Sequence, residues 1–218
     1  MLRYPDREAA GRRLASALGA YAAKTDTIVL GLPRGGVIVA AQVASALRLP
    51  LDTFTVRKLG VPWNPELAVG AIATGDVVVF DHDGMRTVGL SMHDLAPIIE
   101  MEERELARRD AVFRAGRGEL AVRGKTAIVV DDGLATGATM TAAVEALRKL
   151  GARRIVCAVP VGAEAACTSL RALADECECL EMPHPFYGVG AWYDDFHDVS
   201  DQEVLDALDA HPPAPQPA

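Results

Sequence analysis

Short apolar runs alternate along this chain with segments whose apolar residues recur every three or four positions. The runs lie at residues 27–30, 51–56, 76–80, 126–130 and 155–159. Runs of this length are typical of buried strands, and the longer spacing is typical of helices. Strands and helices that alternate in this way build a parallel sheet covered by helices on both faces. The pattern therefore predicts an α/β fold with a parallel twisted sheet.

The same pattern predicts where the helices lie. The expected helices cover residues 7–18, 37–44, 91–114, 139–151, 164–174 and 200–210. Asp6 is a suitable N-cap for the first of them. Two others open on a capping-box pattern, a Ser followed three positions later by an acidic residue: Ser91 with Asp94, and Ser200 with Glu203.

One domain accommodates all of these elements. With 218 residues, 50% of them hydrophobic, the chain is long enough for a single core and a small appendage. We expect the domain to span residues 1–210 and to include a long mobile loop at 57–67, between two strands. A disordered Pro-rich tail is expected at 211–218.

Charge and apolar content restrict the partners and the location. The formal charge of −8 argues against nucleic acid and against an anionic membrane surface as partners. The first residues contain no apolar run of signal-peptide type, and no stretch approaches the ~18 apolar residues that span a bilayer. A cytoplasmic protein is expected, and the pattern does not distinguish a monomer from a homo-oligomer.

The four cysteines give no sign of a metal site or of a disulfide framework. Cys157, Cys167, Cys177 and Cys179 are 10, 10 and 2 positions apart, which matches no zinc half-site. The alternation around Cys177 and Cys179 places both on the inward face of a strand. Free, buried thiols are expected.

The most informative segment follows the apolar run at 126–130. It consists of Asp131 and Asp132 and then Gly133-Leu134-Ala135-Thr136-Gly137-Ala138-Thr139, before a helix. A helix N-terminus offers unpaired N–H groups and a partial positive charge, which suit a phosphate. The Thr hydroxyls add donors, and the carboxylates can accept hydrogen bonds from ribose hydroxyls. These groups together fit a sugar 5-phosphate, whereas an ordinary strand-to-helix turn explains only one Asp and one Gly. A Walker A lysine and a G-x-G-x-x-G segment after the first strand are both missing from the sequence.

This segment resembles the phosphoribosyl pyrophosphate signature of the type I phosphoribosyltransferases: four apolar residues, two acidic ones and a loop ending in T-G-x-T. The resemblance implies the fold of that family, with a small C-terminal hood at about 182–200. It also implies that Asp131 and Asp132 hold the ribose hydroxyls of phosphoribosyl pyrophosphate and that residues 133–139 hold its 5-phosphate. Mg²⁺ would be the cofactor.

A second segment, Leu32-Pro33-Arg34-Gly35-Gly36, follows the first apolar run. The resemblance implies a loop here that binds pyrophosphate through backbone amides, often with a strained peptide bond. Arg34 would pair with pyrophosphate oxygens, and Gly35 and Gly36 would let the backbone fold around them. Taken alone, the segment is equally typical of a Gly-rich tight turn.

Two further segments occupy places that matter in this family. The resemblance implies that Arg57 and Lys58 begin a loop that closes over the active site, which makes them catalytic candidates; the alternative is a solvated pair at a strand end. In the hood, Trp192 is a candidate to stack on the acceptor base and Asp195 to contact magnesium. Aromatic packing of a small subdomain explains the same residues.

The resemblance implies Mg-dependent transfer of the 5-phosphoribosyl group to a nitrogen acceptor, with release of pyrophosphate. Enzymes for 6-oxopurines place a Lys near the strand after the phosphate-loop helix, but the last Lys here is Lys149. The segment from Ser91 to Arg114, with the L-P-R-G-G and V-R-K-L-G segments, resembles a group of uncharacterised bacterial phosphoribosyltransferase-like proteins. Two alternatives stay open: a regulatory module that binds the sugar phosphate or a nucleotide without turnover, and a hydrolase or phosphorylase acting on a ribose 5-phosphate.

Overall fold

A five-stranded parallel sheet forms the centre of the computed structural model, which describes residues 3–211 apart from the side chains at 65 and 66. The strand order is β2-β1-β6-β7-β8, and all neighbouring strands are parallel. The strands are β1 Thr27–Gly31, β2 Leu51–Thr53, β6 Thr126–Val130, β7 Arg154–Val161 and β8 Glu176–Glu181. The predicted α/β fold is confirmed. The tail expected at 211–218 lies outside the described residues except for His211.

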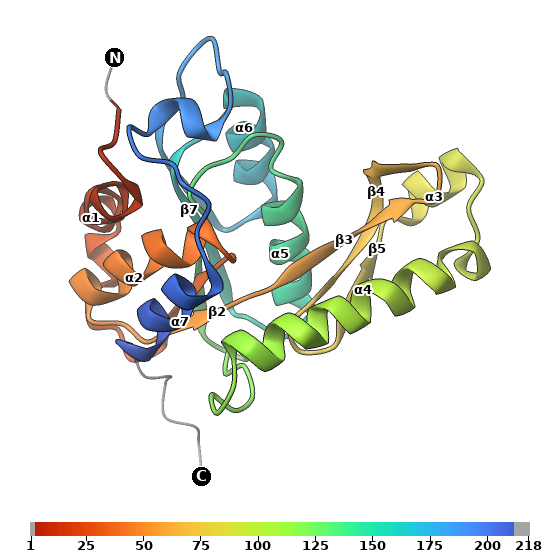
Figure 1. The fold of residues 1–218 in the computed structure, drawn as a ribbon, viewed down its shortest axis with the longest axis horizontal. Helices are drawn as coiled ribbons and strands as arrows, with labels where there is room; N and C mark the ends of the chain where they lie inside the picture. The colour runs from red at the N-terminus through yellow and green to blue at the C-terminus, as the bar shows by residue number, and fades with distance from the viewer. Residues whose placement is uncertain (1–2, 212–218) are drawn as a thin grey trace.

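Helices cover both faces of this sheet (Figure 1). One face carries α1 Arg7–Ala17, α2 Gly35–Leu47 and α7 Asp201–Asp209, and the other carries α5 Ala138–Lys149 and α6 Glu164–Leu173. Successive strand residues point to opposite faces. Ile128 and Val130 therefore pack under α2, whereas Ala127 and Val129 pack under α5. Short 3-10 helices lie at Gly19–Tyr21 and Val189–Trp192.

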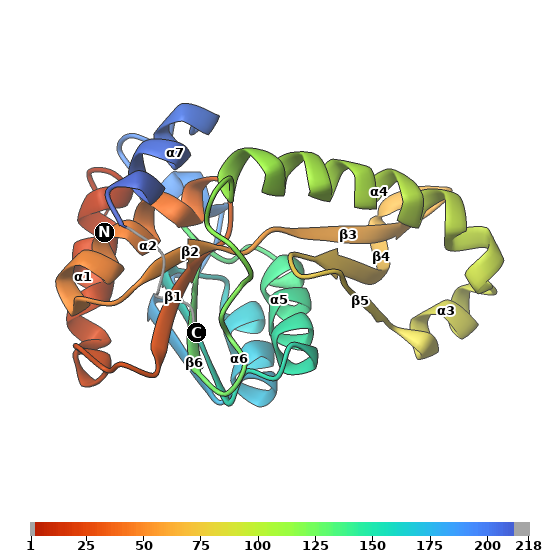
Figure 2. The same cartoon turned by 90° about the horizontal axis from the view of Figure 1, so that it is seen from below.

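A second, antiparallel sheet extends from this core as an arm (Figure 2). It contains β3 Val56–Val61, β4 Asn64–Ala73 and β5 Val77–Phe80, in that order. The helix α3 His82–Val88 lies at the far end of the arm, and the long helix α4 Met92–Phe113 runs back along it. Ile72 of β4 packs with Leu106 of α4, while Ala71 packs with Ala142 of α5. The arm is thus a sheet held between two helices.

The arm corrects one prediction. Residues 57–67 were expected to form a long mobile loop, but they form β3 and the first part of β4. Leu59 and Val61 are buried, because α4 covers the face of the sheet on which they lie. The strand pattern is not visible in the sequence of this segment, because it is interrupted by Gly60, Pro62 and Pro65.

The predicted helix starts are confirmed. The Asp6 carboxylate accepts from the Ala9 N–H, and complete capping boxes open α4 and α7 at Ser91 and Ser200. All four cysteines are free, as expected. Cys157, Cys167 and Cys179 are buried, whereas Cys177, which was also expected to be buried, is half-buried. Within residues 3–211, no helix is both long and apolar enough to cross a membrane.

Candidate functional site

Two loops meet at the carboxyl edge of the central sheet. The Arg-Gly-Gly loop (residues 32–36) follows β1, and the Asp-Asp loop (residues 131–139) follows β6. β1 and β6 are neighbouring parallel strands, so their carboxyl ends deliver both loops to one place. The Leu32 N–H donates to the Val130 carbonyl at 2.9 Å and ties the loops together.

Both glycines of the Arg-Gly-Gly loop are needed for this close approach. A Cβ on Gly36 would lie 2.7 Å from the carbonyl oxygen of Val130, and one on Gly35 would overlap the Asp132 carboxylate. The peptide bond between Pro33 and Arg34 is cis. The glycines therefore serve the contact between the two loops, in addition to any role in binding an anion.

The two carboxylates of the Asp-Asp loop are half-buried. Burial raises the pKa of Asp131 well above its usual range, and the adjacent charge of Asp132 raises it further. Burial also raises the pKa of Asp132, although the guanidinium of Arg7 opposes that rise. The Asp132 N–H donates to Asp131 Oδ1 at 2.9 Å. Such a pair would be stabilised by a ligand that brings hydroxyl donors or positive charge.

Arg7, which the sequence did not single out, is the cation beside these carboxylates. Its Nε lies 2.8 Å from Asp132 Oδ2, with both side chains largely buried. Its Nη1 donates to the His197 carbonyl at 2.9 Å, and the guanidinium lies 3.9 Å from the centre of the Phe196 ring. Arg7 thereby joins α1, the Asp-Asp loop and the C-terminal segment.

Tyr193 is a second contact that the sequence did not reveal. Its hydroxyl donates to the backbone carbonyl of Asp132 at 2.6 Å. The ring packs against Tyr4, at 5.6 Å between ring centres. The segment around Tyr193 therefore supports the Asp-Asp loop through this hydrogen bond.

The rest of the Asp-Asp loop presents donors at the start of α5. Leu134 is buried and anchors the loop, because its N–H donates to Val161 and its carbonyl accepts from Ala163. Ala135 and Thr136 are exposed, and Gly137 has a left-handed φ of 78° that suits glycine. Within residues 3–211, the N–H groups of residues 135–137 donate to no other protein group. Free N–H groups at a helix start are suited to a phosphate.

The basic candidates Arg57 and Lys58 lie beside these loops, on β3. A cavity of about 480 Å³ is lined by both of them, by Pro33 of the Arg-Gly-Gly loop and by Thr139 of the Asp-Asp loop. Arg57 Nη2 lies 2.6 Å from Glu102 Oε2 of α4. The structure thus brings Arg57 and Lys58 together with both loops, and both residues lie on a regular strand, β3, rather than on a loop.

The third basic candidate, Arg34, points elsewhere. Its Nη1 lies 3.7 Å from Asp201 Oδ1 at the start of α7, and both side chains are about half exposed. It lines a separate cavity of about 170 Å³ with Arg108 and Arg109. In this conformation its guanidinium is engaged by α7.

The hood candidates have structural contacts. Trp192 is only 5% exposed and packs with Tyr4, Val161 and Tyr193. Its ring is enclosed by protein, which fits the packing alternative; stacking on an acceptor base stays a prediction.

Asp195 is exposed and accepts hydrogen bonds from the backbone N–H of His197, at 3.2 Å, while its Oδ1 lies 3.0 Å from His197 Nδ1. The structure gives it no further acidic partner for a metal, because the described residues contain no cluster of three or more His, Cys, Asp or Glu side chains placed to hold an ion. Asp131 and Asp132 remain as oxygen donors. Mg²⁺ commonly uses one or two carboxylates, several waters and substrate phosphates. This donor set fits a magnesium ion that binds together with a pyrophosphate group.

Comparisons with known proteins cover both loops of the site. A family model described as a phosphoribosyl transferase domain matches residues 1–195, which include both loops. Two curated proteins of Mycobacterium tuberculosis, from strains CDC 1551 and H37Rv, each bear the name "putative phosphoribosyl transferase" and are 44% identical over 206 residues. These matches cover 94% of this chain and 46% of each relative, so the chain spans less than half the length of those relatives. The crystal structure of TT1426 from Thermus thermophilus is similar at 39% identity and a TM-score of 0.88, over 97% of this chain and 100% of that one.

Proposed function

The chain belongs to the phosphoribosyl transferase domain family, and from this we propose that it transfers the 5-phosphoribosyl group of phosphoribosyl pyrophosphate to a nitrogen acceptor. The observation that carries the proposal is the meeting of the Asp-Asp loop and the Arg-Gly-Gly loop at one edge of the sheet. One ligand with a phosphate, two ribose hydroxyls and a pyrophosphate would engage both loops.

The Asp-Asp loop would hold the ribose 5-phosphate. Asp131 and Asp132 would accept hydrogen bonds from the vicinal ribose hydroxyls, which replace the water that burial has removed from the carboxylates. The free N–H groups of residues 135–137 and the Thr136 and Thr139 hydroxyls would bind the 5-phosphate. Arg7 would act as a positioning residue, because it fixes Asp132 without reaching the reacting carbon.

The leaving group would lie toward the Arg-Gly-Gly loop and β3. The bond between the anomeric carbon and the pyrophosphate oxygen breaks, the bond to the acceptor nitrogen forms, and the acceptor loses a proton. Arg57 and Lys58 would stabilise the negative charge that develops on pyrophosphate. Bound Mg²⁺ would neutralise part of that charge. Holding the sugar and the acceptor together would supply a further part of the rate enhancement.

The acceptor would occupy the cavity between β3 and α4. Its walls include Val61, Pro62, Ile98 and Met101, which offer apolar surface to a flat ring beside the basic pair. The segment after β7 has no Lys, which argues against a 6-oxopurine acceptor.

The test measures pyrophosphate release from phosphoribosyl pyrophosphate with Mg²⁺ and a panel of purine, pyrimidine and amine acceptors. Release should require one acceptor and should vanish in an Asp131→Asn/Asp132→Asn variant. An Asp83→Asn variant on the exposed α3 is the matched control and should remain active.

Other results would replace the proposal with one of its alternatives. Release without any acceptor would identify a hydrolase. Binding of phosphoribosyl pyrophosphate without release would identify a regulatory module. Absence of binding by calorimetry would refute the assignment of both loops.

A further inference from the structure

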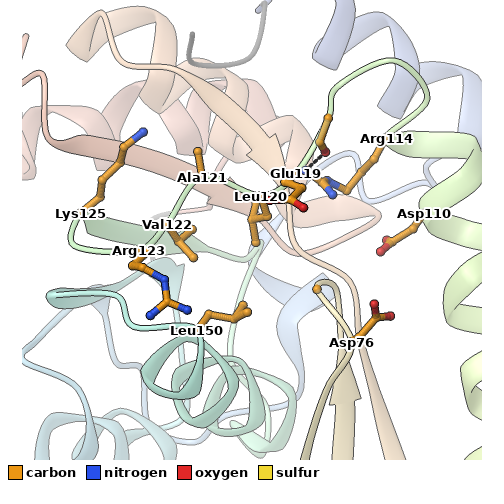
Figure 3. Close-up of a pocket in the computed structure, with 12 residues that line it drawn as sticks. Asp76, Asp110, Arg114, Glu119, Leu120, Ala121, Val122, Arg123, Lys125 and Leu150 are labelled. Carbon is orange, nitrogen blue, oxygen red and sulfur yellow. Dashed lines mark hydrogen bonds between the residues drawn. The ribbon is translucent and has the colours of Figure 1, made fainter. Parts of the chain in front are cut away.

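A second cavity lies at the opposite end of β6 from the Asp-Asp loop. It measures about 930 Å³ and is enclosed by the end of α4, the turn between β4 and β5, the segment that leads into β6, and Leu150 after α5 (Figure 3). Lys125 lines it immediately before β6, whereas Asp131 follows β6 directly. We propose that this cavity is a separate binding site for a nucleoside monophosphate.

The cations of the cavity carry the first step of the argument. The chain has 22 basic residues, and within residues 3–211 the side chains of all but three have an ion pair, a hydrogen bond or another recorded interaction. The three are Arg48, Arg123 and Lys125, and the last two line this cavity. Figure 3 shows the Lys125 ammonium and the Arg123 guanidinium directed to different parts of the cavity wall, so each offers an anion a separate contact.

The other basic side chain of the cavity is already engaged. Arg114 Nη2 lies 3.1 Å from Asp52 Oδ2. The same nitrogen donates to the Gly118 carbonyl at 3.1 Å (Figure 3). Arg114 therefore shapes the wall, and the capacity to bind an anion rests on Arg123 and Lys125.

Two carboxylates lie across the cavity from these cations. Figure 3 shows Asp76 and Asp110 on the side opposite Arg123 and Lys125. Asp110 Oδ1 accepts a hydrogen bond from the Thr74 hydroxyl at 3.0 Å. Asp76 is held in the β4–β5 turn with a left-handed φ of 56°, a conformation that Asp tolerates better than most residues. These oxygens can accept hydrogen bonds from the N–H groups of a base.

Apolar side chains and the carboxylate of Glu119 lie between the two charged sides. Leu120, Val122 and Leu150 provide the apolar surface, and the leucines lie between the cations and the acids in Figure 3. A ligand that matches all three regions has a phosphate at one end, a flat ring in the middle and amino or imino donors at the other end. A nucleoside monophosphate has this arrangement, whereas inorganic phosphate would use only one region.

The test measures binding of AMP, GMP, CMP and UMP to the full chain by isothermal titration calorimetry. At least one of them should bind, and Arg123→Ala/Lys125→Ala should weaken it by about tenfold or more, as the loss of charge-assisted hydrogen bonds predicts. Arg48→Ala, which removes the third unpaired cation away from the cavity, is the matched control and should bind as the original chain does.

Variants at the first site separate this proposal from the proposed function. The proposed first site would also accept the ribose 5-phosphate of these nucleotides, so the Asp131→Asn/Asp132→Asn variant isolates the second cavity, where binding should persist. Loss of binding there, with retention in Arg123→Ala/Lys125→Ala, would assign the nucleotide to the first site and overturn the inference.

Two more results would overturn it: no binding of any of the four nucleotides, or equally tight binding of inorganic phosphate. Ala121→Trp, which fills the cavity without changing its charge, should also abolish binding, and circular dichroism would verify that this variant is folded.

Discussion

Replacing Arg7 by Met tests how far the ribose-binding carboxylates depend on one buried ion pair. Arg7 and Asp132 have side chains that are 8% and 15% exposed, and their closest atoms are 2.8 Å apart. Removing one partner of a buried pair costs about 3–5 kcal/mol, because the other charge is left without compensation. The residual exposure places the expected loss near the lower end, at about 3 kcal/mol of unfolding free energy.

The pH dependence gives this prediction a sharper form. Without Arg7, burial should raise the pKa of Asp132 further above its unfolded value. The folded variant then binds a proton more readily than the unfolded chain does, so its stability relative to the original chain increases as the pH falls. The loss caused by Arg7→Met should therefore shrink as the pH is lowered from 7 toward 4.

Urea unfolding followed by circular dichroism at several pH values measures both effects. Arg12→Met is the matched control on the same helix, since Arg12 pairs with Glu8 at the exposed surface; its loss should stay within about 1 kcal/mol. Adding Asp132→Asn to Arg7→Met should recover most of the stability. Equal losses for the Arg7 and Arg12 variants, or a loss that does not change with pH, would refute the reasoning.

Three further predictions address the loops and the core. Asp131→Asn should stabilise the fold at pH 7 by about 0.5–2 kcal/mol, because it removes a buried charge, and should weaken binding of phosphoribosyl pyrophosphate. Thermal unfolding measures the change in stability, and calorimetry measures the change in binding. A lower melting temperature would contradict the predicted stabilisation. Gly36→Ala should destabilise the fold by about 1–3 kcal/mol, because the new methyl group overlaps the Val130 carbonyl oxygen. Gly19→Ala is the control and should have little effect, because no atom lies within 4 Å of its new methyl group. Similar unfolding midpoints for the two variants would argue against the close contact between Gly36 and Val130. Burial raises the pKa of Cys157 to about 12, so iodoacetamide at pH 8 should modify this thiol only when urea unfolds the chain. Mass spectrometry measures the extent of modification. Rapid labelling of the native chain would show that the thiol is accessible and would contradict the prediction.

The central sheet was predictable because each of its strands carries its own signal. β1 and β6 are buried on both faces, so every position after the first, Thr27 or Thr126, is apolar or small and the run is visible without knowledge of its neighbours. β3 has no such signal. Its sequence Val-Arg-Lys-Leu-Gly-Val becomes a strand because α4 covers one side and β4 pairs with its edge.

The candidate site was predictable to the extent that its chemistry is local in sequence. The Asp-Asp loop contains both carboxylates and the helix start within nine consecutive residues, 131–139. Arg7 lies 125 positions from Asp132 in the sequence, and nothing in its neighbouring sequence distinguishes it from the exposed Arg12. Trp192 could be read as a binding or a packing residue, and its contact with Tyr4, at the other end of the chain, favours packing.

The ordered arm has a consequence for the entropy of binding. Fixing the backbone of a flexible residue costs about 1–2 kcal/mol, so ordering an eleven-residue loop at 57–67 would consume roughly 10–20 kcal/mol of binding free energy. In this structure β3 carries both Arg57 and Lys58, and Arg57 pairs with Glu102 of α4. Because no loop has to fold, ligand binding to the cavity lined by Arg57 and Lys58 should show only a small heat-capacity change. Any closure of the arm would move it as a preformed unit.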